Sequence, residues 1–376
     1  MRPHFSVSLS FCLSLLACKT AHPSDSSLNA SLMVSPPSPQ EIYDHPAWMR
    51  YVDETSSKQE LQPACQPASF RHQDTLKGMV ILFHGFTACP QQYFDVADEL
   101  SRQGWDVYLP TNPGHGLRRD GQVAEDQLLP TRDDYASQFG AFIKTINEVA
   151  RTSEAPVKVV GGLSLGGALA TAAFAEAPEL YQRALIMTPF YAMRKPMSYF
   201  LGGLKNVDAI SERLAPEALS QLAQSGSDRL LEKEVGWGPP CEEEANLGRQ
   251  GICKFRVTHL VGSQQFGYEF SQKEEIKGRL QFVGVANDPA IDNDRLKWYV
   301  EKRVKRPDSQ AELCFYPNGA NHSLISTYDA PSQNKFWLSS FKQAFYAFVT
   351  KGTFFPTKKQ KVEGYPQCEG PDKPEA

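Results

Sequence analysis

Continuous apolar runs alternate with amphipathic stretches along most of this chain. The runs have the length of strands and lack the polar alternation of half-exposed ones; they lie at 79–83, 105–109, 159–163, 184–188, 280–285 and 312–316. Such runs are typical of strands buried on both faces of a parallel sheet. Between them, apolar residues recur at helical spacing, most clearly from Tyr135 to Val149. Strands alternating with helices predict an α/β fold with a mostly parallel central sheet flanked by helices.

Local signals predict where the helices begin and end. One helix is expected from about Pro90, since proline suits a first turn, to a stop at Gly104. Another is expected from Thr131, with Asp134 three residues later as a near capping box. An alanine-rich helix should run to about Ala177. A terminal helix should bury an apolar side made of Phe336, Leu338, Phe341, Phe345 and Phe348.

The alternation breaks after Pro189. Residues 190–275 are mainly polar and of helical pattern, and their place between two sheet strands predicts an inserted helical cap. The sheet domain would then comprise 61–189 and 276–350, followed by a C-terminal tail at 351–376. Methionine and aromatic residues at 190–201 fit either an acyl-binding pocket or packing of cap against core.

The N-terminus has the pattern of an export signal. Its apolar run ends before residue 17 and is shorter than the roughly 20 residues of a spanning helix. The sequence Leu-Leu-Ala-Cys at 15–18 resembles a bacterial lipobox, which implies lipidation of Cys18 and removal of residues 1–17. Residues 18–60 would be a flexible tether, although the pattern at 41–77 is also compatible with a segment that wraps onto the domain or supplies irregular early strands. Because Lys19 is not aspartate, an outer-membrane place in the bacterial envelope is favoured; the alternative is an ordinary secretory signal with an incidental Cys18.

Charge and cysteine content narrow the classes of protein to which this chain could belong. The net charge of −4 leaves no broad basic surface for nucleic acid. Six cysteines remain after Cys12 and Cys18, an even count that fits disulfides in an exported protein: Cys65, Cys89, Cys241, Cys253, Cys314 and Cys368. Their pairing stays open, although Cys241 and Cys253 are the most local pair. No C-x-x-C or H-x-x-x-H spacing indicates zinc, and the chemistry expected below needs no cofactor.

A G-x-S-x-G motif at residues 162–166 lies between a predicted strand and a predicted helix. That context holds the serine in a tight elbow with its hydroxyl exposed. A serine nucleophile needs a base, and the base needs an orienting carboxylate. The sequence places Ser164, Asp288 and His322 in that order, each after a predicted strand. Such positions gather at the carboxyl edge of a parallel sheet.

Alternatives exist for two of these positions. Asp292 and Asp294 lie in the same loop as Asp288, which is preferred because it directly follows the strand. His115, in the turn at 112–116, is a weaker candidate base than His322. An oxyanion would be bound by the backbone N–H groups of Phe86 and Leu165.

These motifs together resemble the α/β-hydrolase superfamily. They are His-Gly-Phe-Thr at 84–87, Asn-Pro-Gly-His-Gly at 112–116, residues 162–167, Asp288 and His322. Over about residues 78–350 the chain is similar to the carboxylesterase and monoacylglycerol-lipase-like (serine aminopeptidase-type) group. The resemblance implies a serine hydrolase acting on a small-molecule ester or lipid through an acyl-enzyme on Ser164, with His322 as base and Asp288 orienting it.

Two other functions stay open. An aminopeptidase or amidase could use the same triad, with Glu242, Glu243 and Glu244 binding a free α-amine. A non-catalytic lipoprotein of the cell envelope could keep the fold alone. The oligomeric state is not predicted.

Overall fold

The computed structural model describes residues 45–58, 60–72, 75–119, 122–123, 127–194, 230–232, 251–273, 275–304, 309–327, 335–354 and 366–369. The chain divides into residues 1–36 and residues 37–376, and all described residues belong to the second unit. The predicted signal peptide, Cys18, most of the tether and most of the cap lie outside the described residues. Within them, no helix combines the length and apolar character that crossing a bilayer requires.

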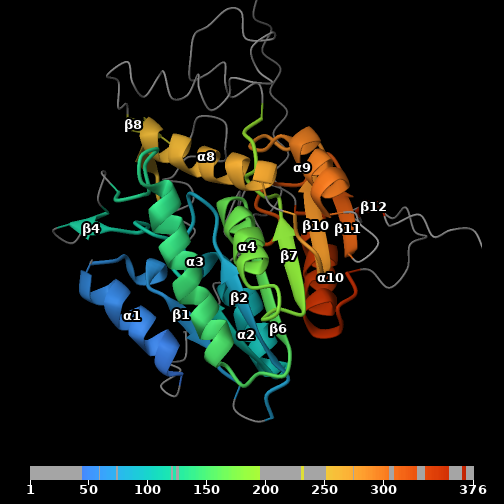
Figure 1. The fold of residues 1–376 in the computed structure, drawn as a ribbon, viewed down its shortest axis with the longest axis horizontal. Coiled ribbons are helices and arrows are strands. Elements are labelled where there is room, and N and C mark those ends of the chain that lie inside the picture. The colour runs from blue at the N-terminus through green and yellow to red at the C-terminus, as the bar shows by residue number, and fades with distance from the viewer. Residues whose placement is uncertain are drawn as a thin grey trace, which may run out of the picture. The chain divides into compact units, whose positions relative to one another are not determined.

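An eight-stranded sheet forms the centre of the fold (Figure 1). Its strands are β1 (Ala68–Phe70), β2 (Gly78–Phe83), β3 (Trp105–Leu109), β6 (Lys158–Leu163), β7 (Arg183–Met187), β10 (Arg279–Val285), β11 (Gln310–Tyr316) and β12 (Gln367–Glu369). Their order is β1-β3-β2-β6-β7-β10-β11-β12. All neighbours are parallel except β1 with β3 and β11 with β12. The predicted parallel α/β sheet is confirmed. Two further antiparallel pairs of short strands join β4 (Arg118–Arg119) with β5 (Gln122–Val123) and β8 (Leu230–Glu232) with β9 (Lys254–Arg256).

Helices cover both faces of the sheet because its strands are apolar on both. On β2, Ile81 and Phe83 join a core with α1 (Pro46–Lys58), α3 (Tyr135–Thr152), α4 (Leu165–Glu176), α8 (Val257–Lys273) and α9 (Asn293–Tyr299). The alternate residues Val80 and Leu82 join a second core with α2 (Phe94–Arg102) and α10 (Leu338–Lys351). Burial on both faces explains the continuous apolar runs of these strands.

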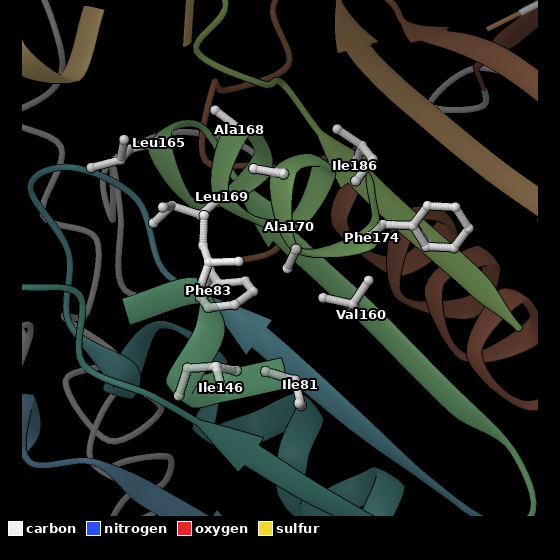
Figure 2. Packing of buried hydrophobic residues seen from close by; sticks show 14 of the residues in the cluster. Ile81, Phe83, Ile146, Val160, Leu165, Ala168, Leu169, Ala170, Phe174 and Ile186 are labelled. Carbon is white, nitrogen blue, oxygen red and sulfur yellow. The ribbon is translucent and has the colours of Figure 1, made fainter. Parts of the chain in front are cut away.

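Helix α4 carries the motif serine at its N-terminal end and is apolar on all sides. A helix of that kind is stable only when it is surrounded by protein. Figure 2 shows its side chains among those of β2, β6, β7 and α3: Leu165, Ala168, Leu169, Ala170 and Phe174 with Ile81, Phe83, Ile146, Val160 and Ile186. The helix that positions Ser164 is therefore fixed by the core itself.

Two helices begin later than the sequence predicts. Helix α3 starts at Tyr135 because the Asp134 carboxylate accepts hydrogen bonds from the Thr131 N–H, at 2.6 Å, and hydroxyl, at 2.9 Å. Those bonds close a turn where a first helical turn was expected. The helix expected from Pro90 begins as the 3₁₀ turn η2 (Pro90–Tyr93), and α2 follows from Phe94.

The predicted tether at 18–60 is too long at its C-terminal end. Residues 46–58 form α1, whose Trp48 is 2% exposed and contacts Tyr108 with ring centroids 5.1 Å apart. A buried tryptophan stabilises a segment that composition alone assigns to a linker.

The structure also settles two disulfide pairings. Cys65 bonds to Cys89, and Cys314 bonds to Cys368. The second bond holds β12 against β11, so part of the predicted tail is the edge strand of the sheet. Cys253 is also disulfide-bonded, while Cys241 lies outside the described residues.

Helix α8, in the last part of the predicted cap, packs directly on the core. The Phe266 and Phe139 rings lie 4.8 Å apart. A Cβ atom at Gly267 would approach the Phe190 carbonyl oxygen to 1.9 Å, so only glycine permits this approach. Residues 195–229 and 233–250 of the cap lie outside the described residues, and the predicted domain boundaries there stay a prediction.

Candidate active site

Ser164 occupies a strained turn between β6 and α4. Its backbone angles are φ 59° and ψ −118°, a conformation that side-chain-bearing residues rarely adopt. The turn closes only because its neighbours are small. A Cβ at Gly162 would lie 2.1 Å from the Gly166 oxygen, and one at Gly166 would lie 1.9 Å from the Phe83 oxygen. Both glycines are therefore steric requirements of the elbow, as the motif indicates.

The main chain of Ser164 is held on both sides. Its N–H donates to the Met187 carbonyl at 2.9 Å, and its carbonyl accepts from the N–H groups of Ala168, at 3.1 Å, and Phe190, at 2.9 Å. The residue is 8% exposed. Within the described part of the chain, no hydrogen bond joins its hydroxyl to His322.

Asp288 and His322 form a hydrogen-bonded pair. The loops after β10 and β11 bring His322 Nδ1 to 2.8 Å from Asp288 Oδ2 and 3.0 Å from Oδ1. A carboxylate can only accept, so Nδ1 carries the proton and Nε2 is free to act as a base. The Asp288 side chain is inaccessible to solvent, whereas that of His322 is 14% exposed. The buried acid thus orients a base that reaches the surface of the site.

The Asp288 carboxylate is fixed by its own loop. Its Oδ1 also accepts from the N–H groups of Ala290, at 2.8 Å, and Ile291, at 3.1 Å. Asp292 has a different partner set, because its Oδ1 accepts from the N–H groups of Asp294 and Arg295 and so caps α9. Asp294 is exposed. Of the three carboxylates in this loop, Asp288 is the one that contacts His322.

The two expected oxyanion donors lie on different loops. Leu165 is the first residue of α4, where helical N–H groups lack intrahelical acceptors and the helix dipole favours an anion. Phe86 follows β2, and its N–H shares a peptide group with the Gly85 carbonyl. All described peptide bonds are trans, so this N–H points away from the Gly85 oxygen.

His84 sets the direction of that peptide group. The Asn112 N–H donates to His84 Nε2 at 2.9 Å, which assigns the proton to Nδ1. Nδ1 then donates to the Gly85 oxygen at 2.9 Å. Burial, the larger cause, and the neighbouring His115 hold the pKa of His84 well below its usual value, so the ring stays neutral and keeps both bonds.

His115 supports the same loop from the other side. Its Nε2 lies 2.8 Å from the Phe86 oxygen, and its Nδ1 lies 3.0 Å from the Pro113 oxygen. The residue is 1% exposed, and burial lowers its pKa to about 4. Its nitrogens face backbone carbonyls of the loops at 86 and 113, which is the geometry of a support for those loops.

The chain is similar to known hydrolases in sequence pattern and in structure. Residues 74–233 match the family described as serine aminopeptidase, S33. A soluble variant of monoglyceride lipase from Saccharomyces cerevisiae aligns with a TM-score of 0.55 and 15% identity over 78% of this chain and 96% of that one. A monoacylglycerol lipase from Paleococcus ferrophilus aligns at 0.53 and 15% identity over 78% and 100%, respectively. A carboxyl esterase from Bacillus coagulans aligns at 0.53 and 13% identity over 77% and 94%.

The protein has the α/β-hydrolase fold. No curated protein matches the sequence. In this fold, the predicted residues Ser164, Asp288 and His322 follow β6, β10 and β11 at the carboxyl ends of these strands.

The roles of three residues of the site are not apparent from the sequence. Asn112 fixes the tautomer of His84. Thr188 donates its hydroxyl to the His322 carbonyl at 3.3 Å. Arg194 donates to the carbonyls of Asn287 and Asp288. Each contacts residues that are distant in sequence, so neither motif nor periodicity reveals its role.

Proposed function

We propose that this α/β-hydrolase is a serine hydrolase that cleaves carboxylic esters of small molecules or lipids. The observation that carries the proposal is the Asp288–His322 hydrogen bond, formed at the carboxyl ends of the strands where the Ser164 elbow also lies. A histidine held in this orientation by a buried carboxylate is the base that a serine nucleophile requires. The similarity to lipases and an esterase supports the same reaction class.

The reaction proceeds through two proton-coupled steps. The Ser164 oxygen attacks the ester carbonyl carbon while its proton passes to His322 Nε2. The tetrahedral adduct then breaks its carbon–alkoxy bond, and the alcohol leaves with the proton from His322. Water attacks the resulting acyl-enzyme, again giving a proton to His322, and Ser164 recovers that proton when the carboxylic acid leaves.

The negative charge of the tetrahedral adduct requires fixed donors. The Leu165 and Phe86 N–H groups fill that role in this proposal. The bonds from His84 and Ala88 to the Gly85 oxygen, at 2.9 and 3.1 Å, fix the peptide that carries the Phe86 N–H. Donors that are oriented before the reaction stabilise the transition state without reorganisation.

Turnover of p-nitrophenyl esters of graded chain length tests the reaction. Wild type should hydrolyse them, and Ser164→Ala should lose activity by at least about 10³-fold, because the nucleophile is absent. Circular dichroism and the thermal midpoint of Ser164→Ala should match wild type. Equal rates for the two proteins would contradict the proposal and favour a non-catalytic role.

Amide hydrolysis is the second candidate, because the matched family is described as serine aminopeptidase. The same triad could cleave an aminoacyl amide, with a free α-amine as the recognised group. Aminoacyl p-nitroanilides compared with matched aminoacyl esters would decide. A higher kcat/KM for the anilides, lost in Ser164→Ala, would replace the ester assignment.

We also propose that Cys18 anchors the enzyme to a bacterial envelope membrane, with the outer membrane favoured. The lipobox-like residues 15–18 support this proposal. Full-length protein expressed in a bacterium should incorporate a fatty-acid label and fractionate with membranes. Cys18→Ser should do neither. An unlabelled wild-type protein would indicate an ordinary secretory signal.

A further inference from the structure

One short segment contacts the main chain of all three proposed catalytic residues. It is the connector, residues 188–194, which follows the carboxyl end of β7 and includes the first residues of the predicted cap. The Phe190 N–H donates to the Ser164 carbonyl at 2.9 Å. The Thr188 hydroxyl donates to the His322 carbonyl at 3.3 Å. Arg194 Nη1 donates to the Asp288 carbonyl at 3.0 Å.

The connector also pairs with the loop that bears Asp288. The Asp292 N–H donates to the Ala192 carbonyl at 2.8 Å, and the Arg194 N–H donates to the Ala290 carbonyl at 3.1 Å. These bonds form an antiparallel bridge centred on Met193 and Ile291. The two segments therefore cannot shift independently.

Arg194 binds this loop where its backbone adopts a left-handed conformation. Its Nη1 donates to the Asn287 carbonyl, at 3.1 Å, as well as to that of Asp288. Asn287 has a left-handed φ of 56°. A cationic donor makes stronger hydrogen bonds than a neutral one, and here it bonds two successive carbonyls of one loop. Two sets of bonds thus hold the loop. Arg194 bonds the backbone carbonyls of Asn287 and Asp288. The N–H groups of Ala290 and Ile291 bond the Asp288 carboxylate.

We propose that Arg194 is a positioning residue for Asp288. The inference rests on the proposed serine-hydrolase function. Arg194 acts through the Asp288 loop, so its loss should misplace His322 and lower kcat while KM changes little. A displacement of about 1 Å at a catalytic group can lower the rate about 10²-fold.

The same strand supplies a matched control. At the amino end of β7, Arg183 Nη1 donates to two successive carbonyls, Phe348 and Val349, both at 2.8 Å. Arg183→Met removes the same kind of contact far along the strand from the triad. Arg194→Met and Arg183→Met keep similar aliphatic stems and lose the same donors.

Kinetics of the full-length variants test the proposal. Arg194→Met should lower kcat by about 10- to 100-fold with KM within about twofold of wild type. The kcat of Arg194→Lys, which keeps a cationic donor, should lie between those of Arg194→Met and wild type. Arg183→Met should keep wild-type kcat. A kcat for Arg194→Met within twofold of wild type, or an equal loss in Arg183→Met, would overturn the proposal.

A spectroscopic measurement separates this inference from the proposed function. The His322 Nδ1 proton bonded to Asp288 should give a low-field proton resonance, identified by its absence in Asp288→Asn. The resonance should be lost or shifted in Arg194→Met and kept in Arg183→Met, provided that both stay folded by circular dichroism. An unchanged resonance in Arg194→Met would refute the positioning role even if ester hydrolysis is observed. A changed resonance in a protein without esterase activity would refute only the proposed reaction.

Discussion

The two ends of the parallel strands differ in backbone conformation. At the carboxyl ends, Ser164, Thr188 and Asn287 follow β6, β7 and β10, and each has a positive φ, of 59°, 38° and 56°. Among the described residues, these are the non-glycine positions with positive φ. Such conformations cost on the order of 1–3 kcal/mol each and cluster at functional sites.

The amino ends carry stabilising contacts, and the positive φ values there, at Gly104 before β3 and Gly278 before β10, belong to glycine. Lys77, just before β2, donates to the Gln103 carbonyl at the end of α2 at 2.8 Å. Lys158, the first residue of β6, donates to Ala150 near the end of α3 at 2.7 Å. Arg183, the first residue of β7, bonds the last turn of α10. A cation at a helix C-terminus interacts favourably with the unpaired carbonyls and the helix dipole.

Within a single strand, the amino end therefore contributes to stability and the carboxyl end carries residues of the candidate site. Strands β6 and β7 each begin with a basic residue whose side chain caps a helix. Each is followed directly by a residue with an unfavourable backbone conformation. The amino edge should therefore tolerate substitutions at a cost in stability only. Substitutions at the carboxyl edge should raise the activation free energy of the reaction by more than they lower the free energy of unfolding.

The largest effect is expected at the acid loop. Asp288→Asn should lower kcat by about 10²- to 10⁴-fold, because the amide cannot hold His322 in the required tautomer as a carboxylate does. Asp292→Asn is the matched control in the same loop. Asparagine caps helices as well as aspartate does, so this variant should keep wild-type kcat and stability. A larger loss in Asp292→Asn would contradict the assignment of Asp288.

The two disulfides whose cysteines are both among the described residues should differ in their effect on the site. Each closes a loop, with sequence separations of 24 and 54, so chain entropy predicts about 3–4 kcal/mol of stability for either bond. Of these two bonds, Cys65–Cys89 is the one that lies against the loops that orient the proposed oxyanion donors. The Thr111 hydroxyl donates to the Cys65 carbonyl at 2.5 Å, and a Cβ at Gly116 would lie 2.2 Å from Cys65 Cβ.

Paired serine substitutions measure this difference. Cys65→Ser with Cys89→Ser should lower both the unfolding free energy and kcat. Cys314→Ser with Cys368→Ser should lower stability by a similar amount and leave kcat unchanged. Urea unfolding would measure the change in stability of each double variant, and steady-state kinetics recorded well below the thermal midpoint would measure its kcat. Equal kcat losses in both pairs would mean that the first bond has no specific role at the site.

His84 should affect catalysis by about 10- to 100-fold, an amount below the loss of a direct oxyanion donor. Asparagine at this position can place an N–H near that of Nδ1, whereas glutamine places its amide near Nε2. His84→Gln should therefore lose more kcat than His84→Asn. The rate ratio between an ester and its thionoester, which reports on the oxyanion site, should fall in His84→Gln. Equal kinetics for the two variants would remove His84 from the oxyanion account.

The smallest effect is expected at the amino edge. Lys158→Met keeps the aliphatic stem and removes the donor to α3, which should cost about 1 kcal/mol of unfolding free energy. The kcat should equal that of wild type. Lys144→Met, on an exposed position of α3, controls for the loss of charge. A fall in kcat for Lys158→Met would contradict the statement that the amino end of the strand affects stability alone.

Sequence patterns predict the parts of this fold that depend on burial and local sterics. The strands are recognisable because both faces are buried, and the elbow because Gly162 and Gly166 are sterically required. The order of Ser164, Asp288 and His322 follows from the strands they succeed. In contrast, α1 is stabilised by the burial of Trp48 against Tyr108, a contact between residues distant in sequence. The same limit applies to the Cys65–Cys89 pairing, the tautomer of His84 and the contact of Arg194 with Asp288.

The most direct test of the central claim is covalent labelling with a fluorophosphonate. The Ser164 oxygen should displace fluoride from phosphorus, and intact mass should show a single adduct per chain that peptide mapping places on Ser164. Asp288→Asn should label far more slowly, and Ser164→Ala should not label. Labelling at another residue, or equal labelling of wild type and Ser164→Ala, would contradict a nucleophile at the carboxyl edge of the sheet.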